Sequence, residues 1–212
     1  MFFILAWLLV VALRLSLPKF KKMKKLILIS VLLIISFSVC AQDKRSLEER
    51  TVLNYSYTAS EQYEKLMDFT HPKLFTIVPR DKMVEILQRM TKGDGFVITI
   101  APVAPRFNFG EIKKIDDASY SVITYDLAMK MRFTEPVADD ELEFLLASFK
   151  TNLKTDDVTF DKKDNSFTII KRSQAVAIWD KDTNGKWMFV NNSDGPIRTR
   201  LFSEKVIKEL GI

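Results

Sequence analysis

The segment that most constrains the fold is Ser173–Asn192, whose pattern predicts two β-strands joined by a tight turn. Both arms consist of apolar, aromatic and β-branched residues, which favour strands. The polar stretch between them contains Asn184-Gly185, a pair that tolerates the two positive φ angles of a type I′ turn. We therefore expect an antiparallel hairpin in which Trp179 and Trp187 lie close enough to pair across the turn and anchor the sheet.

The first 41 residues differ in composition from the rest of the chain. Of the 32 Lys and Arg residues, six lie in this leader together with no Asp or Glu, which leaves 26 basic residues against 27 acidic ones. The net charge of +5 therefore belongs to the leader. The remaining chain has no basic excess that would predict a nucleic acid or an anionic membrane as its partner.

The leader itself has the layout of a secretory signal peptide over residues 23–41. A basic stretch ending at Lys25 is followed by the apolar run 26–37, and small residues then precede an expected cleavage after Ala41. At ~1.5 Å per residue the apolar run spans about 18 Å, which is too short for a ~30 Å hydrocarbon core. We expect export to the periplasm or cell surface of a Gram-negative-type bacterium.

Residues 1–22 precede this signal and add a further apolar run, 2–13, where signal peptides rarely have one. We interpret residues 1–22 as an upstream extension and Met23 as the true initiator. The alternative is a membrane hairpin built from both apolar runs.

Cys40 is the only cysteine, and it could carry a lipid anchor if the leader were a lipoprotein signal. Val39 stands where that motif requires a small residue, so cleavage after Ala41 is the preferred interpretation. The mature chain would then contain no thiol, no disulfide and no thiolate metal site.

The mature chain, 42–212, is predicted to be a single α+β domain in which N-terminal helices pack on a curved, mostly antiparallel, cone-like sheet. We expect one long helix over 46–69, capped at Ser46 and ended before Pro72. A period of two then predicts strands over residues 96–101, 107–115, 119–133, 158–161, 166–171, 175–179 and 187–190. Further helices are expected over residues 82–90, 139–153 and 204–210. Along 119–133, the alternation places Tyr125 on the core side.

The order of these elements resembles the nuclear-transport-factor-two-like, or cystatin-like cone, superfamily, and most closely its small secreted bacterial members. The features that carry the resemblance are the long first helix, the break at Phe69-Thr70-His71-Pro72 and the hairpins ending at Trp187-Met188-Phe189-Val190. The resemblance implies a conical sheet around the first helix with a pocket at its open end. The helix at 139–153 departs from the pattern and would be an insertion or a lid. Members include ketosteroid isomerase and other small-molecule enzymes, non-catalytic ligand binders and dimeric interaction modules, so the fold leaves function open.

His71 is the only histidine, and any acid–base chemistry that needs an imidazole must use it. Asp68 or Asp126 could be its acidic partner in a pocket. The alternative is a His-Pro step that ends a helix, with the imidazole capping carbonyl groups or exposed. A common metal site would need further His or Cys ligands, so we expect no metal and no cofactor.

The hairpin tip, Asp180–Gly185, matches the first half of an EF-hand calcium loop. A complete loop has a bidentate Glu at position twelve and helices on both sides. Here Asn191 occupies that position and strands flank the loop, so we interpret the segment as a polar turn.

Aromatic residues are frequent enough to line an apolar ligand pocket, although rings at such spacings also build an ordinary core. The ligand-binding candidates are Tyr63, Phe69, Phe75, Trp179 and Trp187, and Tyr55 and Phe189 belong to the same aromatic supply.

These observations favour an exported, non-catalytic module that binds an apolar small molecule or a protein partner, with a homodimer as one form of the latter. The alternative is an isomerase- or dehydratase-type enzyme that uses His71 and a pocket aspartate.

Overall fold

The computed structural model describes residues 44–93, 95–102, 104–192 and 196–212. The expected signal peptide at 23–41, the extension 1–22, Met23 and Cys40 lie outside the described residues. Residues Ser46–Ile212 form one compact unit. None of the helices within the described ranges is both long enough and apolar enough to cross a membrane.

The N-terminal helical region is broken where the sequence predicted a single helix to Phe69. The first helix occupies 44–59, so Ser46 lies inside it and not at its cap. The helix ends because Thr58 and Ser60 donate their hydroxyl protons back to the carbonyls four residues earlier and Glu61 takes a positive φ of 57°. Three further helices follow, namely α3 (Tyr63–Met67), α4 (Pro72–Phe75) and α5 (Arg80–Lys92).

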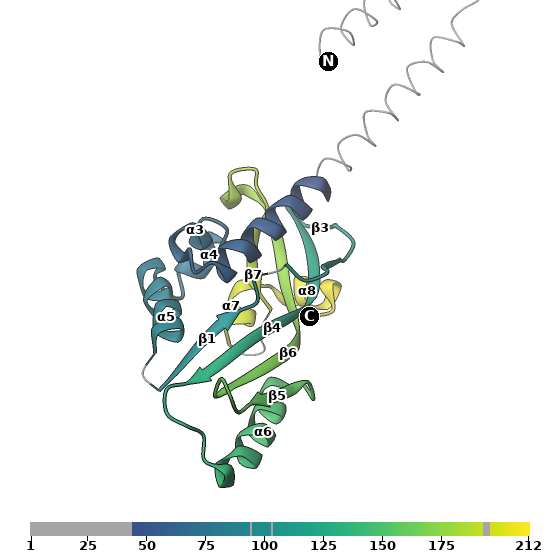
Figure 1. The fold of residues 1–212 in the computed structure, drawn as a ribbon. Helices are drawn as coiled ribbons and strands as arrows, with labels where there is room; N and C mark the ends of the chain where they lie inside the picture. Colours follow the sequence, from purple (N-terminus) through teal and green to yellow (C-terminus); the bar gives the residue numbers. More distant parts are fainter. Residues whose placement is uncertain (1–43, 94, 103, 193–195) are drawn as a thin grey trace, which may run out of the picture. The chain divides into compact units, whose positions relative to one another are not determined.

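The seven described strands form one antiparallel sheet that does not close on itself (Figure 1). Its main order is β1-β4-β6-β5, while β2 and β3 pair with β4 and β7 pairs with β6. The strands are β1 (Phe96–Ile100), β2 (Asn108–Phe109), β3 (Lys113–Ile115), β4 (Ala118–Phe133), β5 (Val158–Asp161), β6 (Ser166–Trp179) and β7 (Met188–Asn191). The expected α+β class, with helices on a curved antiparallel sheet, is confirmed.

Two details of the sheet differ from the sequence prediction. The segments 166–171 and 175–179 form the single strand β6, because Ser173 and Gln174 continue the pairing with β4. The segment 107–115 is interrupted after Phe109 and forms two short strands instead of one.

The hairpin at 173–192 is present, but its connection is longer than a two-residue turn. A short 3-10 helix, η2 (Lys181–Thr183), precedes Asn184 and Gly185, whose φ angles are 50° and 69°. The Lys186 N–H donates to the Thr183 carbonyl over 3.1 Å, which closes the expected turn at the tip. Of the two tryptophans that flank the turn, Trp187 is buried and Trp179 is 42% exposed.

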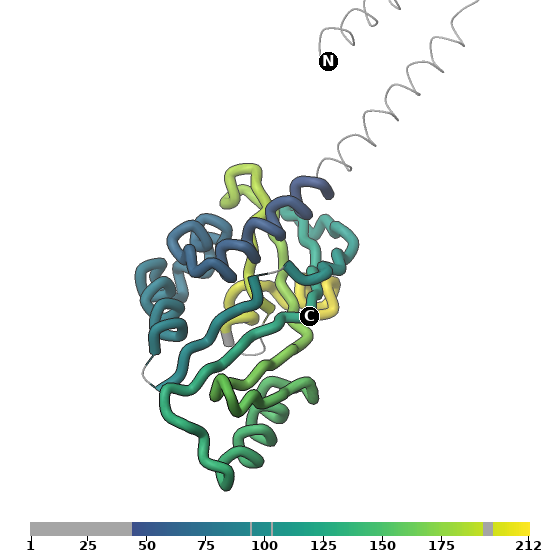
Figure 2. Tube along the Cα trace, in the orientation of Figure 1, coloured from purple at the N-terminus to yellow at the C-terminus, as the bar shows by residue number. Residues whose placement is uncertain are grey.

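The two faces of the sheet are covered by different helices (Figure 2). Val176 and Ile178 of β6 pack in one cluster with Leu201 and Val206, from α7 (Pro196–Leu201) and α8 (Glu204–Leu210). Alternate residues of a strand point to opposite faces, so Phe167, Ile169, Ala175 and Ala177 share the other face. The inserted helix α6 (Asp139–Leu153), at the predicted bounds, packs on Phe167 and Ile169. Leu47 of the first helix packs in a cluster with Ala177.

Candidate functional site

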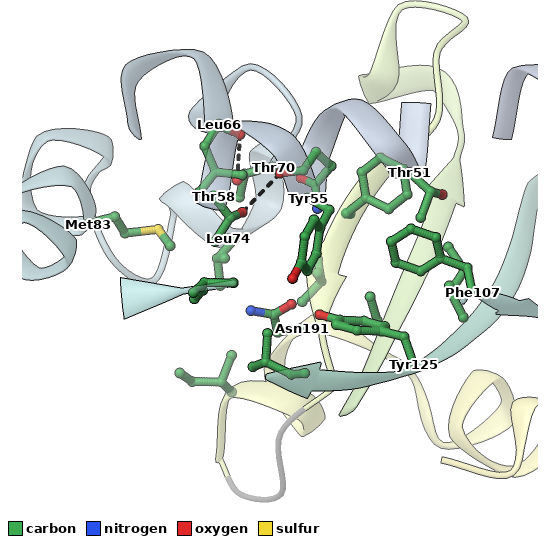
Figure 3. A pocket seen from close by; sticks show the side chains of 18 of the residues that line it. Thr51, Tyr55, Thr58, Leu66, Thr70, Leu74, Met83, Phe107, Tyr125 and Asn191 are labelled. Atoms are coloured by element: carbon green, nitrogen blue, oxygen red, sulfur yellow. Dashed lines mark hydrogen bonds between the residues drawn. The ribbon is translucent and has the colours of Figure 1, made fainter. Parts of the chain in front are cut away.

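A cavity of about 300 Å³ lies between the N-terminal helices and the sheet (Figure 3). This volume is at the lower end of the ~300–1,000 Å³ found for small-molecule sites. The first helix lines it with Thr51, Asn54, Tyr55 and Thr58. The sheet lines it with Ile123, Tyr125, Leu127, Ala175, Phe189 and Asn191. Among the described lining residues only Asn191 and Ile197 are exposed, which places the opening beside these two side chains.

An aromatic wall holds the first helix against the strands at this cavity. The ring centroids of Tyr55, Phe107 and Tyr125 lie 5.4–6.3 Å apart, and each pair meets edge to face. The Tyr55 hydroxyl also donates a hydrogen bond of 2.8 Å to the Ala101 carbonyl, just beyond β1. The helix is therefore positioned by rings and a hydrogen bond at its margin, and the space beside Ala175 stays open.

One part of the cavity is polar. Figure 3 shows the Tyr55 and Tyr125 hydroxyls and the Asn191 amide turned toward the same part of the space. No hydrogen bond joins the Tyr125 hydroxyl or the Asn191 side chain to another described residue. Burial raises the pKa of both tyrosines, and the neighbouring Tyr55 raises the pKa of Tyr125 further, so both phenols keep their protons at neutral pH.

Among the residues that the structure describes, none that lines the cavity has a side chain charged at neutral pH. The described lining of the cavity consists of aliphatic and aromatic side chains together with the hydroxyl and amide groups of Thr, Tyr and Asn. No Asp, Glu, His, Cys, Lys or Arg belongs to this lining. The arrangement can therefore enclose an uncharged molecule and hydrogen-bond to it, and its lining lacks the usual acid–base pair.

His71 lies outside this lining, in a buried structural position with only 3% exposure. Its Nδ1 accepts the Lys73 N–H at 3.3 Å and so caps α4. Since Nδ1 accepts, Nε2 carries the proton and donates to Asp180 Oδ2 at 3.1 Å. The expectation that the imidazole caps carbonyl groups or is exposed is wrong: it caps an N–H at the start of α4 and it is buried.

The structure does not bring Asp68 or Asp126 to His71. Asp68 pairs with Arg80 at 2.9 Å and Asp126 pairs with Arg172 at 3.1 Å, and both carboxylates are mostly exposed. The partner of His71 is Asp180. The sequence did not predict this pair, because the two residues are 109 positions apart. The hairpin pattern located Asp180 at a strand end, but no sequence signal links it to His71.

None of the five aromatic candidates lines the cavity. Tyr63 and Phe75 pack with α5 through Val84, and Phe69 and Trp187 belong to the cluster around Ala177. Trp179 lies exposed at the end of β6. The cavity instead uses Tyr55 and Phe189 from the same aromatic supply, together with Phe107 and Tyr125. The strand alternation that places Tyr125 on the core side was the sequence signal that could have identified Tyr125 as a lining residue.

The described residues contain no group of three or more His, Cys, Asp or Glu side chains arranged to hold a metal ion. The oxygen-rich hairpin tip is engaged in turn formation. Asp180 Oδ1 accepts the Asp182 N–H at 2.9 Å, and the Thr183 hydroxyl accepts the Asp180 N–H at 3.1 Å, which completes a capping box.

Comparison of the chain with models of known protein families gives no match, and comparison with curated proteins gives none either. The cone-superfamily resemblance therefore stays a prediction, and the cavity is the feature of the molecule that bears on function.

Proposed function

We propose that this protein is an exported domain of the cell envelope that binds a small, uncharged and largely apolar molecule without transforming it. The composition of the cavity carries this proposal. Its walls are apolar, its few polar groups are neutral, and no ionised side chain belongs to its described lining. Export is supported by the signal-peptide pattern over residues 23–41.

The size of the cavity limits the ligand. About 300 Å³ is the volume of roughly ten water molecules, each taking ~30 Å³ in the liquid. A molecule of two fused rings or an aliphatic chain of similar bulk matches this space. An ionised ligand would leave its charge buried without a countercharge, which is costly.

Binding can be tested with the purified protein and a panel of neutral bicyclic compounds, by isothermal titration and thermal unfolding. At a free concentration of about 100 times Kd, a ligand that binds only the folded state raises the free energy of unfolding by ~2.7 kcal/mol. The variant Ala175→Leu places bulk in the cavity and should abolish binding. Ala147→Leu, at an exposed position of α6, serves as the matched control. Equal binding by both variants would contradict a site in this cavity.

Export is a separate part of the proposal and has its own test. Expression of the full chain in a Gram-negative host, followed by fractionation, should place a shortened chain outside the cytoplasm. Replacement of Lys24 and Lys25 by Glu should keep the chain in the cytoplasm at full length, because the basic region orients a signal peptide. A full-length wild-type chain in the cytoplasm would contradict export.

A further inference from the structure

We infer that the ligand carries a hydroxyl group, as an alcohol or a phenol does, and that this group sits between Tyr125 and Tyr55. The inference depends on the proposed function, because it names the chemical class of molecule that the same cavity takes. It follows from the hydrogen-bonding capacity left over at the polar end of the cavity.

Tyr55 can only accept a hydrogen bond from a ligand. Its single hydroxyl proton is donated to the Ala101 carbonyl at 2.8 Å, and this bond also fixes the direction of the ring. The lone pairs of Tyr55 Oη remain, since a phenol is both a donor and an acceptor.

Tyr125 has the complementary capacity. Its hydroxyl makes no hydrogen bond to another described residue, so its proton is available to a ligand. The ring is held by edge-to-face contacts with Tyr55 at 6.3 Å and Phe107 at 5.4 Å, which direct the hydroxyl into the cavity. Because the phenol stays protonated at neutral pH, Tyr125 acts there as a donor.

One donor and one acceptor that face the same space match a hydroxyl group, which can accept from Tyr125 and donate to Tyr55. An ether or a ketone could accept from Tyr125 but would leave the Tyr55 lone pairs unused. A hydrocarbon would leave the Tyr125 proton without an acceptor and the Tyr55 lone pairs without a donor, and buried polar groups whose capacity is unused weaken binding. The Asn191 amide, at the opening, can donate or accept a hydrogen bond. It therefore does not change the preference for a hydroxyl over an ether or ketone, and for these over a hydrocarbon.

Three probes of similar size separate these cases at neutral pH: 2-naphthol, 2-methoxynaphthalene and 2-methylnaphthalene. The first can donate and accept, the second can only accept, and the third can do neither. Titration of the purified wild-type protein should give the affinity order naphthol, methyl ether, methyl compound. Each step should be about three- to tenfold, the ratio that one neutral hydrogen bond gives.

Two variants assign the hydrogen bonds. In Tyr125→Phe the advantage of the methyl ether over the methyl compound should disappear. In Tyr55→Phe the advantage of naphthol over the methyl ether should disappear. Tyr120→Phe is the matched control, because Tyr120 is half-buried in the cluster on the opposite face and does not line the cavity, and it should leave both ratios unchanged.

The possible results distinguish this inference from the proposed function. If none of the three probes binds, the proposed function fails. If all three bind with equal affinity, the cavity is a site but the inference of a hydroxyl ligand is wrong. If the ratios persist in Tyr125→Phe and Tyr55→Phe, other groups recognise the hydroxyl, and the inference about these two tyrosines is overturned.

Discussion

The same face of strand β6 is filled at one end and hollow at the other. At the filled end, defined by Phe167 and Ile169, both side chains are fully buried beneath helix α6. The Phe167 ring contacts the rings of Phe133, Phe149 and Phe160 at centroid distances of 4.7–5.7 Å. At the hollow end, defined by Ala175 and Ala177, two methyl groups face the first helix and the cavity lies beside Ala175.

The two ends also differ in how the covering helices are attached. Helix α6 is held by apolar packing on the sheet. The N-terminal segment at the hollow end also makes apolar and aromatic contacts, but hydrogen bonds to the hairpin add to them. His71 N–H donates to the Phe189 carbonyl at 3.1 Å, Phe189 N–H donates to the Phe69 carbonyl at 2.7 Å, and Arg50 Nε donates to the Trp187 carbonyl at 2.6 Å. Directional bonds fix the position of a helix without filling the space beneath it, so they allow a cavity to persist.

The largest effect is expected at the filled end. Phe167→Ala removes a fully buried ring from a close-packed cluster, and we expect the free energy of unfolding to fall by about 3–5 kcal/mol. Urea denaturation measures this value. Phe144→Ala removes a ring from helix α6 that is 72% exposed, and should change this free energy by less than ~0.5 kcal/mol. Similar losses in both variants would show that the filled end is not close-packed.

The hollow end can be examined with two neighbouring alanines. Ala177 is fully buried in the cluster of Trp187 and Phe189, so Ala177→Leu should overpack it and lower the free energy of unfolding by about 1–3 kcal/mol. Ala175 adjoins the cavity, so Ala175→Leu should lower this free energy by less and should block ligand binding. Equal destabilisation by the two substitutions would mean that no usable space lies beside Ala175.

Removal of a hydrogen bond that attaches the hollow end should lower the free energy of unfolding by less than Phe167→Ala does. Asp180→Ala removes the acceptor of the buried His71 Nε2–H and the cap of η2, and should lower the free energy of unfolding by about 1–2 kcal/mol. Asp180→Asn keeps an oxygen acceptor at the same position and should lose less. Thermal unfolding of both variants tests this order, which a purely apolar attachment would not produce.

Local patterns explain which parts of this molecule were predictable. The alternation along β4, the amphipathic spacing of α6 and the Asn184-Gly185 turn each depend on residues close in sequence, and each was correctly anticipated. The cavity depends on distant elements, because it exists only where Ala175 meets a helix held off by Tyr55 and Phe107. The sequence shows that aromatic residues are plentiful. It does not show which of their rings lie next to a small residue such as Ala175 in the folded structure.

The smallest effect on stability is expected at an exposed ion pair on the other face of the sheet, opposite the two ends compared above. Asp126 and Arg172 are both more than half exposed, and their ion pair of 3.1 Å is of the kind that contributes about 0–1 kcal/mol. Asp126→Asn should therefore change the free energy of unfolding by less than ~1 kcal/mol and should leave ligand affinity unchanged. Parallel titration and urea denaturation provide the measurement. A large loss of affinity would place Asp126 in the binding function and would support the enzymatic alternative, in which a carboxylate acts on the ligand.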